Sequence, residues 1–339
     1  MANPIRVLVV DDSSFMRSAL KRRIEQDTRF TVIDTAQNGQ EGVEKALRLK
    51  PDVVTLDVEM PIKNGLEALK EIVAKSTIPV IMVSAITEAG AKITIDALSI
   101  GAVDFIPKSK GADLIHEKLI AAVNAGLSRR IMATRRLAPA AAAQRPARIV
   151  TRVSARLVVI GSSTGGPQAL QEVIKVLPAN LPVPVVVAQH MPPQFTLALA
   201  KRLNDLCPLR VVEAEDGTPL APGTVHIGPG GQHLRVTTTH IKVEPDRGES
   251  LYKPSVDVLV ESAIAAFGKQ ILGVMLTGMG SDGAKEFIKL HKSGGYTLVQ
   301  DQASCVVYGM PRAVADAGAA NEVLPLDQIG SRIRSSFGM

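Results

Sequence analysis

The chain of 339 residues is poor in several residue types, and each shortage argues against a class of function. It has no tryptophan and only 3% aromatic residues, which leaves little of the stacking surface that binders of single-stranded nucleic acid use. Its two cysteines, Cys207 and Cys305, lie far apart and form no C-x-x-C pair. This spacing argues against a disulfide framework and a cysteine-based zinc site, and we expect both cysteines to be small buried residues.

Long apolar runs are also missing. No segment reaches the roughly 18 to 20 apolar residues that a bilayer span needs, and the apolar stretch near the N-terminus ends at Asp11 and Asp12. We therefore expect a cytoplasmic protein that does not insert into membranes. With 46% hydrophobic and 21% charged residues, the chain has the composition of a folded protein and the length for about two domains.

The net charge of +6 is concentrated in one segment. Residues 1–125 carry 16 basic and 17 acidic residues, and residues 157–339 carry 15 and 16, so both parts are close to neutral. Residues 126–156 hold eight arginines and no acidic residue. We interpret residues 126–154 as an extended or partly helical linker between domains at 1–125 and 155–339. We favour a solvated tether over a segment that binds an acidic partner, and we expect no nucleic-acid binding.

The first domain alternates apolar, strand-like runs with helical patterns. The runs are residues 5–10, 31–34, 53–56, 80–83 and 103–106. Alternation of this kind predicts an α/β fold, in which a parallel five-stranded sheet carries helices on both faces. Sites in such sheets form beyond the carboxyl ends of the strands, so the polar residues that follow the runs are the candidates.

Five polar residues follow these runs: Asp11, Asp12, Asp57, Ser84 and Lys108. Three converging carboxylates need a cation, and hard oxygen ligands favour Mg²⁺. With the metal present, one carboxylate can attack a phosphoryl group and form an aspartyl phosphate. Lys108 would neutralise phosphate charge, and the hydroxyl group of Ser84 would bind a phosphoryl oxygen.

This domain resembles the response-regulator receiver family, whose fold is flavodoxin-like, over nearly its whole length. The matching blocks are VVDDSSFMR, VVTLDVEMPIKNGLEAL, VIMVSA and GAVDFIPKS. The resemblance implies that Asp57 is the phospho-acceptor and that Asp11 and Asp12 help to hold Mg²⁺ beside it. It also implies that Ser84 and Phe105 form a switch pair, and that a histidine kinase is the phosphodonor.

The second domain again alternates strand-like and helical patterns, which predicts a second, Rossmann-like α/β fold. One run breaks into the glycine-rich turn RLVVIGSSTGG, residues 156–166. Read as G-x-S-x-G, this turn presents Ser163 as a nucleophile at the end of a strand. The turn also fits a phosphate-binding loop or a helix-capping serine, although it matches neither G-x-G-x-x-G nor the P-loop.

A nucleophilic serine needs a base, and the base needs a carboxylate that fixes its tautomer. His190 follows an apolar run and should lie at the same sheet edge as Ser163; His226 and His233 are weaker candidates. Asp282 follows another run in a glycine-rich loop and is the candidate acid, unless it only caps the following helix. The order Ser, His, Asp argues against the α/β-hydrolase superfamily.

Six blocks match, in order, the catalytic domain of the chemotaxis protein-glutamate methylesterase family. They are GSSTGGP, VVAQHMP, HIGPGG, SVDVLVESA, GVMLTGMGSDGA and YGMPRAV. A receiver followed by this domain resembles the whole architecture of that family. The resemblance implies that Ser163 is the nucleophile, His190 the base and Asp282 the orienting acid.

The same resemblance suggests how the site is lined and what it acts on. Thr164 and Met279 match residues that line the family's site, and backbone N–H groups near Gly165 or Met279 are candidate oxyanion-hole donors. The implied activity is phosphorylation-activated hydrolysis of glutamate γ-methyl esters on chemoreceptors, with deamidation of selected glutamines, for sensory adaptation. We expect a monomer and no cofactor in the catalytic domain, and we hypothesise that the unphosphorylated receiver covers the site of Ser163.

Two alternatives stay open. The first is a non-enzymatic response regulator whose second domain binds a nucleotide or DNA. A DNA role would require binding that depends steeply on salt through the arginine segment, and a nucleotide role would require the turn at 161–166 but not His190. A milder alternative keeps the hydrolase but assigns it another methylated protein as substrate.

Overall fold

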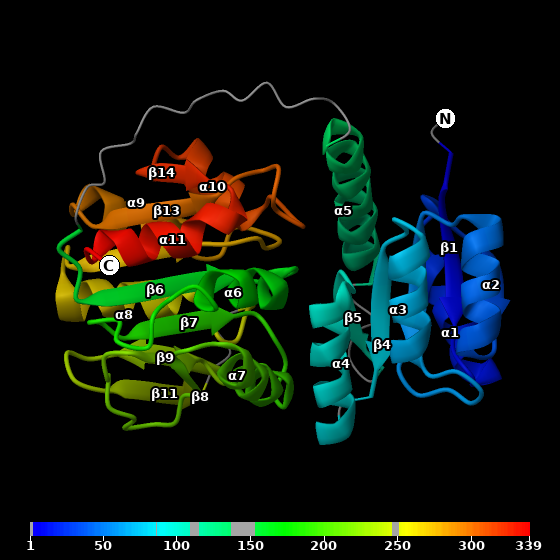
Figure 1. Ribbon diagram of the computed structural model, residues 1–339, viewed down its shortest axis with the longest axis horizontal. Coiled ribbons are helices and arrows are strands. Elements are labelled where there is room, and N and C mark those ends of the chain that lie inside the picture. The colour runs from blue at the N-terminus through cyan, green and yellow to red at the C-terminus, as the bar shows by residue number, and fades with distance from the viewer. Residues whose placement is uncertain (1–2, 86, 109–114, 137–152, 246–250) are drawn as a thin grey trace. The chain divides into compact units, whose positions relative to one another are not determined.

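The computed structural model describes residues 3–85, 87–108, 115–136, 153–245 and 251–339, with the backbone alone described for 127–136. The chain divides into two compact units, Met1–Ala142 and Ala143–Met339, each described here by itself (Figure 1). Of the predicted linker, residues up to Arg136 belong to a helix, and residues 137–152 lie outside the described residues. No helix in the described ranges is long and apolar enough to cross a membrane.

Strands and helices alternate throughout the first unit. They are β1 (Ile5–Val10), α1 (Ser14–Ile24), β2 (Phe30–Ala36), α2 (Gly39–Leu49), β3 (Val53–Asp57), α3 (Gly65–Lys75), β4 (Val80–Ser84), α4 (Glu88–Ile100), β5 (Asp104–Pro107) and α5 (Ile115–Arg136). The strands form one parallel sheet in the order β2-β1-β3-β4-β5. This is the flavodoxin-like order, and it confirms the fold class predicted for this part of the chain.

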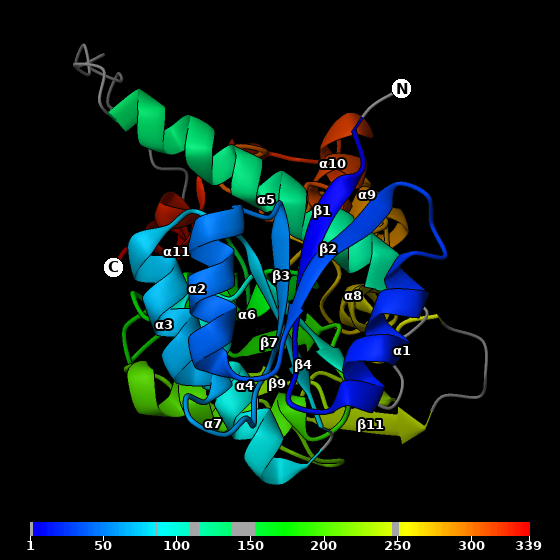
Figure 2. The same ribbon diagram turned by 90° about the vertical axis from the view of Figure 1, so that its right-hand side faces the viewer.

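The sequence determines this arrangement through buried strands and capped helices. Every residue of β3 and of β4 is buried, as expected for strands covered on both faces. Ser13 Oγ accepts a hydrogen bond from Met16 N at the start of α1, and Asn64 and Glu67 form a capping box at the start of α3. Figure 2 shows α2 and α3 on one side of the sheet and α1 on the other.

The second unit is built on a larger parallel sheet. Its elements are β6 (Leu157–Ser162), α6 (Gly166–Ile174), β7 (Val185–Gln189), α7 (Phe195–Leu206), β8 (Arg210–Glu213), β9 (Thr224–Ile227), β10 (Gln232–Val236), β11 (Ile241–Pro245), α8 (Val256–Phe267), β12 (Ile271–Met275), α9 (Ala284–Lys292), β13 (Tyr296–Gln300), α10 (Met310–Asp316), β14 (Glu322–Leu324) and α11 (Leu326–Ser336). The sheet order is β14-β13-β12-β6-β7-β9-β8, and β10 and β11 form a separate antiparallel pair.

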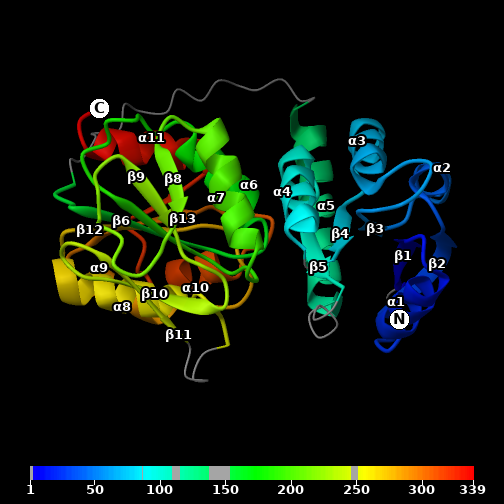
Figure 3. The same cartoon turned by 90° about the horizontal axis from the view of Figure 1, so that it is seen from below.

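Helices cover both faces of this sheet, as a Rossmann-like α/β unit requires. Figure 3 shows α8 and α9 on one side and α6, α7 and α11 on the other. On the first side, fully buried Val256, Leu259 and Val260 of α8 belong to a cluster with residues of β6, β7 and β12. This core fixes the start of α8 against the middle of the sheet, where the strands that carry the candidate site lie.

Several features were not anticipated from the sequence. The antiparallel pair β10–β11, the inner strands β9 and β13 and the edge strand β14 were not predicted. The prediction that both cysteines are buried is right for Cys305 but wrong for Cys207, which follows the last turn of α7 and is half-buried. Partial burial still raises the pKa of Cys207 to about 11, so its thiol is a poor nucleophile near neutral pH.

Candidate functional sites

The first candidate site lies where the order of the smaller sheet reverses. The chain passes from β1 to β2 on one side and returns to β3 on the other, so the carboxyl ends of β1 and β3 flank a crevice. Asp11 and Asp12 follow β1, and Asp57 is the last residue of β3. The topology therefore brings the predicted carboxylates together from positions 45 residues apart.

The three carboxylates form a cluster that fits a hard cation. One oxygen from each of Asp11, Asp12 and Asp57 lies within 4.8 Å of the others. Asp11 is fully buried; its Oδ1 accepts a hydrogen bond from Ser13 N at 2.9 Å, and its Oδ2 forms an ion pair with Lys108 Nζ. Three converging carboxylates, one of them fully buried, offer the hard oxygen ligands that Mg²⁺ prefers.

Lys108 lies directly beside this cluster, as predicted. Its Nζ donates to Asp57 Oδ2 at 2.8 Å and forms an ion pair with Asp11 Oδ2 at 3.2 Å. Burial raises the pKa of Asp57 to about 6, helped by the charge of Asp11 and opposed by the bond from Lys108. The pKa of Lys108 is itself raised, because its bonds to the two carboxylates outweigh the effect of burial. Lys108 is therefore held as a cation at the site.

Ser84 is the last residue of β4 and Phe105 lies in β5, the two strands that follow β3 in the sheet. The Ser84 hydroxyl donates to the carbonyl oxygens of Ala85 at 3.2 Å and Gly90 at 3.4 Å, and so is bound to the start of α4. Phe105 is 4% exposed, with the Lys118 ammonium 5.3 Å from its ring centre. In this structure the Ser84 hydroxyl is thus engaged with backbone, and its predicted contact with a phosphoryl oxygen stays a prediction.

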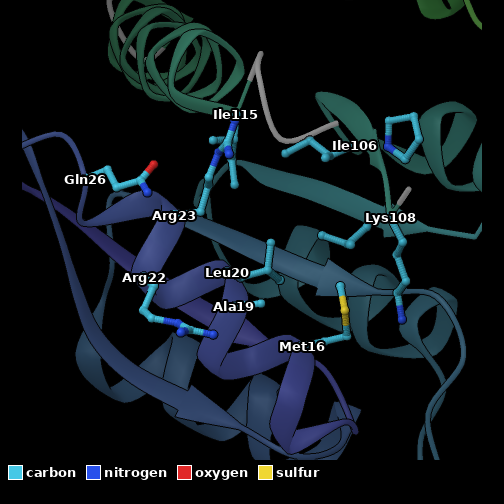
Figure 4. Close-up of a pocket in the computed structure, with 11 residues that line it drawn as sticks. Met16, Ala19, Leu20, Arg22, Arg23, Gln26, Ile106, Lys108 and Ile115 are labelled. Carbon is cyan, nitrogen blue, oxygen red and sulfur yellow. The ribbon is translucent and has the colours of Figure 1, made fainter. Parts of the chain in front are cut away.

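A cavity of about 390 Å³ lies on the α1 side of the same unit. It is lined by Met16, Ala19, Leu20, Arg22, Arg23, Gln26, Val83, Ile106, Pro107, Lys108 and Ile115. Figure 4 shows Met16 and Lys108 at one end of it and Gln26 at the other. Most of the lining residues are apolar, and Lys108 also contacts the acidic cluster.

The second candidate site lies at the corresponding reversal of the larger sheet. There β6 lies between β12 and β7, and the loops after all three strands meet at one edge. Ser163 follows β6, His190 follows β7, and Asp282 lies in the loop after β12. The predicted triad residues therefore come from adjacent strands, which the sequence order alone does not reveal.

Ser163 lies in the turn after β6, and this turn contains a glycine in the left-handed conformation. Gly165 has a φ of 78°, and a Cβ atom there would lie 2.6 Å from the side chain of Val306. Ser163 is half-buried, and its backbone is bonded through its N–H to Thr277 O at 3.0 Å. The Gly166 N–H donates to Ser163 O at 2.8 Å and is not available to a ligand.

His190 and Asp282 form a buried pair. His190 Nε2 lies 2.8 Å from Asp282 Oδ2, and the two side chains are 7% and 8% exposed. Because the carboxylate binds Nε2, the neutral ring carries its proton there and leaves Nδ1 as the basic nitrogen. His190 Nδ1 is buried and has no hydrogen-bond partner among the described residues, Ser163 Oγ included. The pair is thus formed, and the serine–histidine bond is not.

Asp282 is held ionised by the start of α8. Its carboxylate accepts hydrogen bonds from Ser255 Oγ at 2.8 Å and from Val256 N at 2.6 Å. Burial acts to raise the pKa of Asp282, but the bond from His190 and those from α8 lower it below its usual value. The alternative that Asp282 only caps the following helix is wrong, since it binds the start of the preceding one as well as His190.

Two further residues, not singled out from the sequence, position this site. Gln189 accepts a bond from Ser162 Oγ at 2.6 Å and donates from Nε2 to the carbonyl oxygens of Ser163 and His190. Thr277 Oγ1 donates to Thr164 O at 3.0 Å and receives a bond from Val307 N. Gln189 is a polar residue at the end of the buried strand β7, and this position is the sequence signal that could have identified it.

The remaining predicted residues have clear positions. Thr164 is buried beneath the turn, 7% exposed, whereas Met279 is half-buried at the rim. His226 lies inside β9 with both ring nitrogens buried and without a hydrogen-bond partner in the described part of the chain, and burial lowers its pKa to about 4. His233 lies in β10, and neither β9 nor β10 is a neighbour of β6, the strand that Ser163 follows. His190 follows β7, which does lie beside β6, so the geometry favours His190 as the base.

An α/β unit that carries a serine turn and a buried histidine–carboxylate pair has the form of a serine hydrolase. Linked to a flavodoxin-like unit with an acidic cluster, it has the form of a response regulator with an enzymatic output. The sequence pattern of the CheB methylesterase family matches residues 158–333, and that of the response regulator receiver domain matches residues 7–120. The chain belongs to the CheB methylesterase family.

Relatives match almost the whole chain. A protein-glutamate methylesterase/protein-glutamine glutaminase of Symbiobacterium thermophilum is 46% identical over 99% of this chain and 98% of its own length. One from Vibrio cholerae is 42% identical over 99% of both chains. The crystal structure of the Thermotoga maritima CheB methylesterase catalytic domain is 41% identical, covers 54% of this chain and 99% of its own, and superposes with a TM-score of 0.52.

Proposed function

We propose that this protein is a phosphorylation-activated protein-glutamate methylesterase and protein-glutamine deamidase acting on chemoreceptors. The observation that carries the proposal is the buried pair of His190 and Asp282, whose free Nδ1 lies at the same sheet edge as the Ser163 turn. The full-length similarity to proteins named for both activities supports it. The substrate class would be receptor segments with methylated or amidated glutamate side chains.

In the proposed reaction, Ser163 Oγ attacks the γ-carbonyl carbon and gives its proton to His190 Nδ1. The Nε2–H of His190 stays bonded to Asp282, which stabilises the imidazolium that forms. The C–O bond of the ester then breaks, and methanol leaves with the proton from Nδ1. An amide substrate reacts in the same way and releases ammonia.

Water completes the cycle. It attacks the acyl group on Ser163 while His190 Nδ1 takes one of its protons, and the serine leaves with that proton as the glutamate carboxylate forms. The oxyanion would be stabilised by backbone N–H groups. The Gly166 N–H is already bonded to Ser163 O, so we assign this role to the N–H groups of Gly165 and Met279, with Thr164 lining the site. No cofactor enters these steps.

In the receiver unit, Asp57 would accept the phosphoryl group from a histidine kinase. Asp11, Asp12 and Asp57 would hold Mg²⁺, which supplies charge neutralisation to the incoming phosphoryl group when bound. Lys108 would neutralise further charge from its present position beside Asp57. Ser84 would turn from the Gly90 carbonyl toward the phosphoryl group, and the packing of Phe105 would respond.

The setting follows from these roles. The protein would act in the cytoplasm, as a monomer and without nucleic acid, on receptor helices that reach into that compartment. The phosphate-loop alternative is disfavoured because the N–H of Gly166, at the start of α6, points to Ser163 O instead of toward a ligand. No observation favours DNA binding over hydrolysis.

The test is release of methanol from methylated chemoreceptor membranes by wild type and Ser163→Ala, each with and without a small-molecule phosphodonor and Mg²⁺. We expect release by wild type that the donor increases, and a loss of about 10⁴-fold or more in Ser163→Ala. Ammonia release from receptors with the corresponding glutamines tests the second activity. Equal release by both proteins would refute the assignment of Ser163.

A further inference from the structure

The structure leaves the orientation of His190 only partly explained. Its ring is bonded at one atom, Nε2, to Asp282, while Nδ1 is buried without a partner in the described part of the chain. A single hydrogen bond fixes one ring atom but allows the plane of the imidazole to turn about it. A base whose second nitrogen must meet a serine needs that plane to be fixed as well.

Tyr252 supplies a surface that fixes this plane. Its ring lies parallel to the imidazole of His190, with an angle of 3° between the planes and 4.2 Å between the ring centres. At this separation the two rings are in stacking contact, so a turn of the imidazole out of this plane would displace the tyrosine ring. Tyr252 is half-buried and lies four residues before the start of α8.

The hydroxyl end of the Tyr252 side chain is itself packed against the backbone. A Cβ atom added to Gly280 would lie 3.0 Å from the Tyr252 hydroxyl oxygen, so that hydroxyl rests over the backbone of Gly280. Gly280 has a φ of 78° and belongs to the loop that carries Asp282. Ser255 and Val256, which bind Asp282, lie in the same stretch as Tyr252. One segment, residues 252–256, therefore holds both partners of the histidine–carboxylate pair.

The stacked ring also suits the charge that His190 acquires. During the proposed reaction the imidazole becomes a cation in a site where its side chain is only 7% exposed, so water contributes little to its stabilisation. The face of an aromatic ring attracts a cation, and the attraction grows when the pair is shielded from water. A tyrosine and a phenylalanine provide this face, whereas leucine provides only apolar cover.

We propose that Tyr252 is a positioning residue for His190, which keeps the imidazole in the plane that serves both Asp282 and Ser163 and stabilises the imidazolium. This inference rests on the proposed Ser163–His190–Asp282 mechanism. It assigns the role to the ring face of Tyr252 and none to its hydroxyl group. It further predicts that the residue affects the chemical step more than the binding of receptor.

The test compares Tyr252→Leu and Tyr252→Phe in the full chain, with Leu251→Ala as the matched control in the neighbouring, 86% exposed position. Methanol release gives kcat and KM, and thermal melting reports folding. We expect Tyr252→Leu to lower kcat about five- to tenfold with KM within twofold of wild type. Tyr252→Phe and Leu251→Ala should keep kcat within twofold. Wild-type kcat in Tyr252→Leu, or an equal loss in Tyr252→Phe, would overturn the proposal.

A second readout is independent of activity. NMR of histidine-labelled protein should show the Nε2–H of His190 as a hydrogen-bonded, slowly exchanging proton in wild type and Tyr252→Phe. Its exchange should be about tenfold faster in Tyr252→Leu, and unchanged exchange would overturn the proposal even if that variant were poorly active. Should Ser163→Ala and His190→Gln retain methanol release, the proposed function fails, while this signal still tests Tyr252.

Discussion

The candidate sites of the two units lie at the same topological position but differ in their charge balance. In each, the carboxyl ends of neighbouring parallel strands meet where the sheet order reverses. In the first unit three carboxylates face the single ammonium group of Lys108, which leaves excess negative charge among these four residues. In the second, the carboxylate of Asp282 is satisfied by His190 and by the start of α8.

The difference teaches how one architecture serves two chemistries. An unbalanced acidic cluster is a binding site for a cation and then for a phosphoryl group, because both reduce its excess charge. A balanced pair needs no cation and keeps its charge pattern ready for proton transfer. The two pKa directions express this contrast: that of Asp57 is raised to about 6 and that of Asp282 is lowered.

The largest effect should come from breaking the second site. Ser163→Ala, His190→Gln and their combination should each lower methanol release by about 10⁴-fold, without adding, because the two residues act in one proton transfer. Phosphorylation of Asp57 should be unchanged in all three proteins, measured with a radiolabelled phosphodonor. Additive losses, or a loss of phosphorylation, would contradict the separation of the two sites.

Disabling the first site should abolish activation by phosphorylation and leave the basal hydrolysis of the ester unchanged. Asp57→Asn should show no increase of methanol release with phosphodonor and Mg²⁺, while its release without donor stays within about twofold of wild type, since Asp57 takes no part in acyl transfer. Lys45→Gln, which alters an ion pair with Asp34 elsewhere in the same unit, is the control and should respond like wild type. An Asp57→Asn protein that still responds would refute the phospho-acceptor.

The pH dependence of phosphorylation sharpens the contrast. Below its pKa of about 6 Asp57 is protonated and cannot attack, so the rate of phosphorylation in low Mg²⁺ should fall about tenfold per pH unit below 6. Bound Mg²⁺ favours the ionised form and should move this fall to lower pH. A rate that is constant from pH 7 to pH 5 in low Mg²⁺ would contradict the raised pKa.

The same shift has a consequence for stability. The folded-state pKa of Asp57 lies above its unfolded value of about 3.9, so folding takes up a proton between these values. The contribution of this group is therefore present below about pH 4 and is lost as the pH rises to 6, by about 3 kcal/mol. Urea unfolding of wild type and Asp57→Asn at pH 4.5 and 7.5 should show the variant gaining relative stability at the higher pH.

Removal of the metal should affect the reaction of the first unit and not that of the second. Asp12 is exposed, so Asp12→Asn should fold normally and weaken Mg²⁺ binding by about tenfold, measured by calorimetry. Chelation with EDTA should stop phosphorylation and leave the reaction of Ser163 with a fluorophosphonate unchanged. Inhibition of that labelling by EDTA would place a metal in the second unit, against our expectation.

The smallest effect is expected at Ser162. Its hydroxyl is fully buried and donates to Gln189, which in turn holds the backbone of Ser163 and His190. Ser162→Ala should lower the free energy of unfolding by about 1 kcal/mol and kcat by about two- to threefold, because Gln189 keeps its two other bonds. A loss of more than about 30-fold would mean that Gln189 depends on this serine for its position.

Much of both sites could be predicted from the sequence, because strand ends and charge are local signals. Asp57, Lys108, Ser163, His190 and Asp282 each follow a recognisable apolar run. The partners of these residues were harder to find, since a hydrogen bond depends on which strands become neighbours. That β12 lies beside β6, and so brings Asp282 near His190, is not apparent from chain order.

Residues that act through packing contacts could not be identified from the sequence. Tyr252 lies in a polar segment without periodicity, and its stacking on His190 depends on a backbone path set by α8 and by the loop around Gly280. The position of Cys207 was mistaken because a small apolar residue at the end of a helix can be covered or open, depending on the following turn. The boundaries of the arginine-rich linker remain a prediction.

The central claim, that a phosphorylated receiver controls a serine hydrolase in one chain, is tested most directly by the labelling of Ser163. The rate of its reaction with a fluorophosphonate is measured by mass spectrometry in wild type and Asp57→Asn, with and without phosphodonor and Mg²⁺. We predict a single labelled residue, Ser163, and a rate that the donor raises in wild type only. Labelling at another residue, or a rate that the donor leaves unchanged in wild type, would contradict the account.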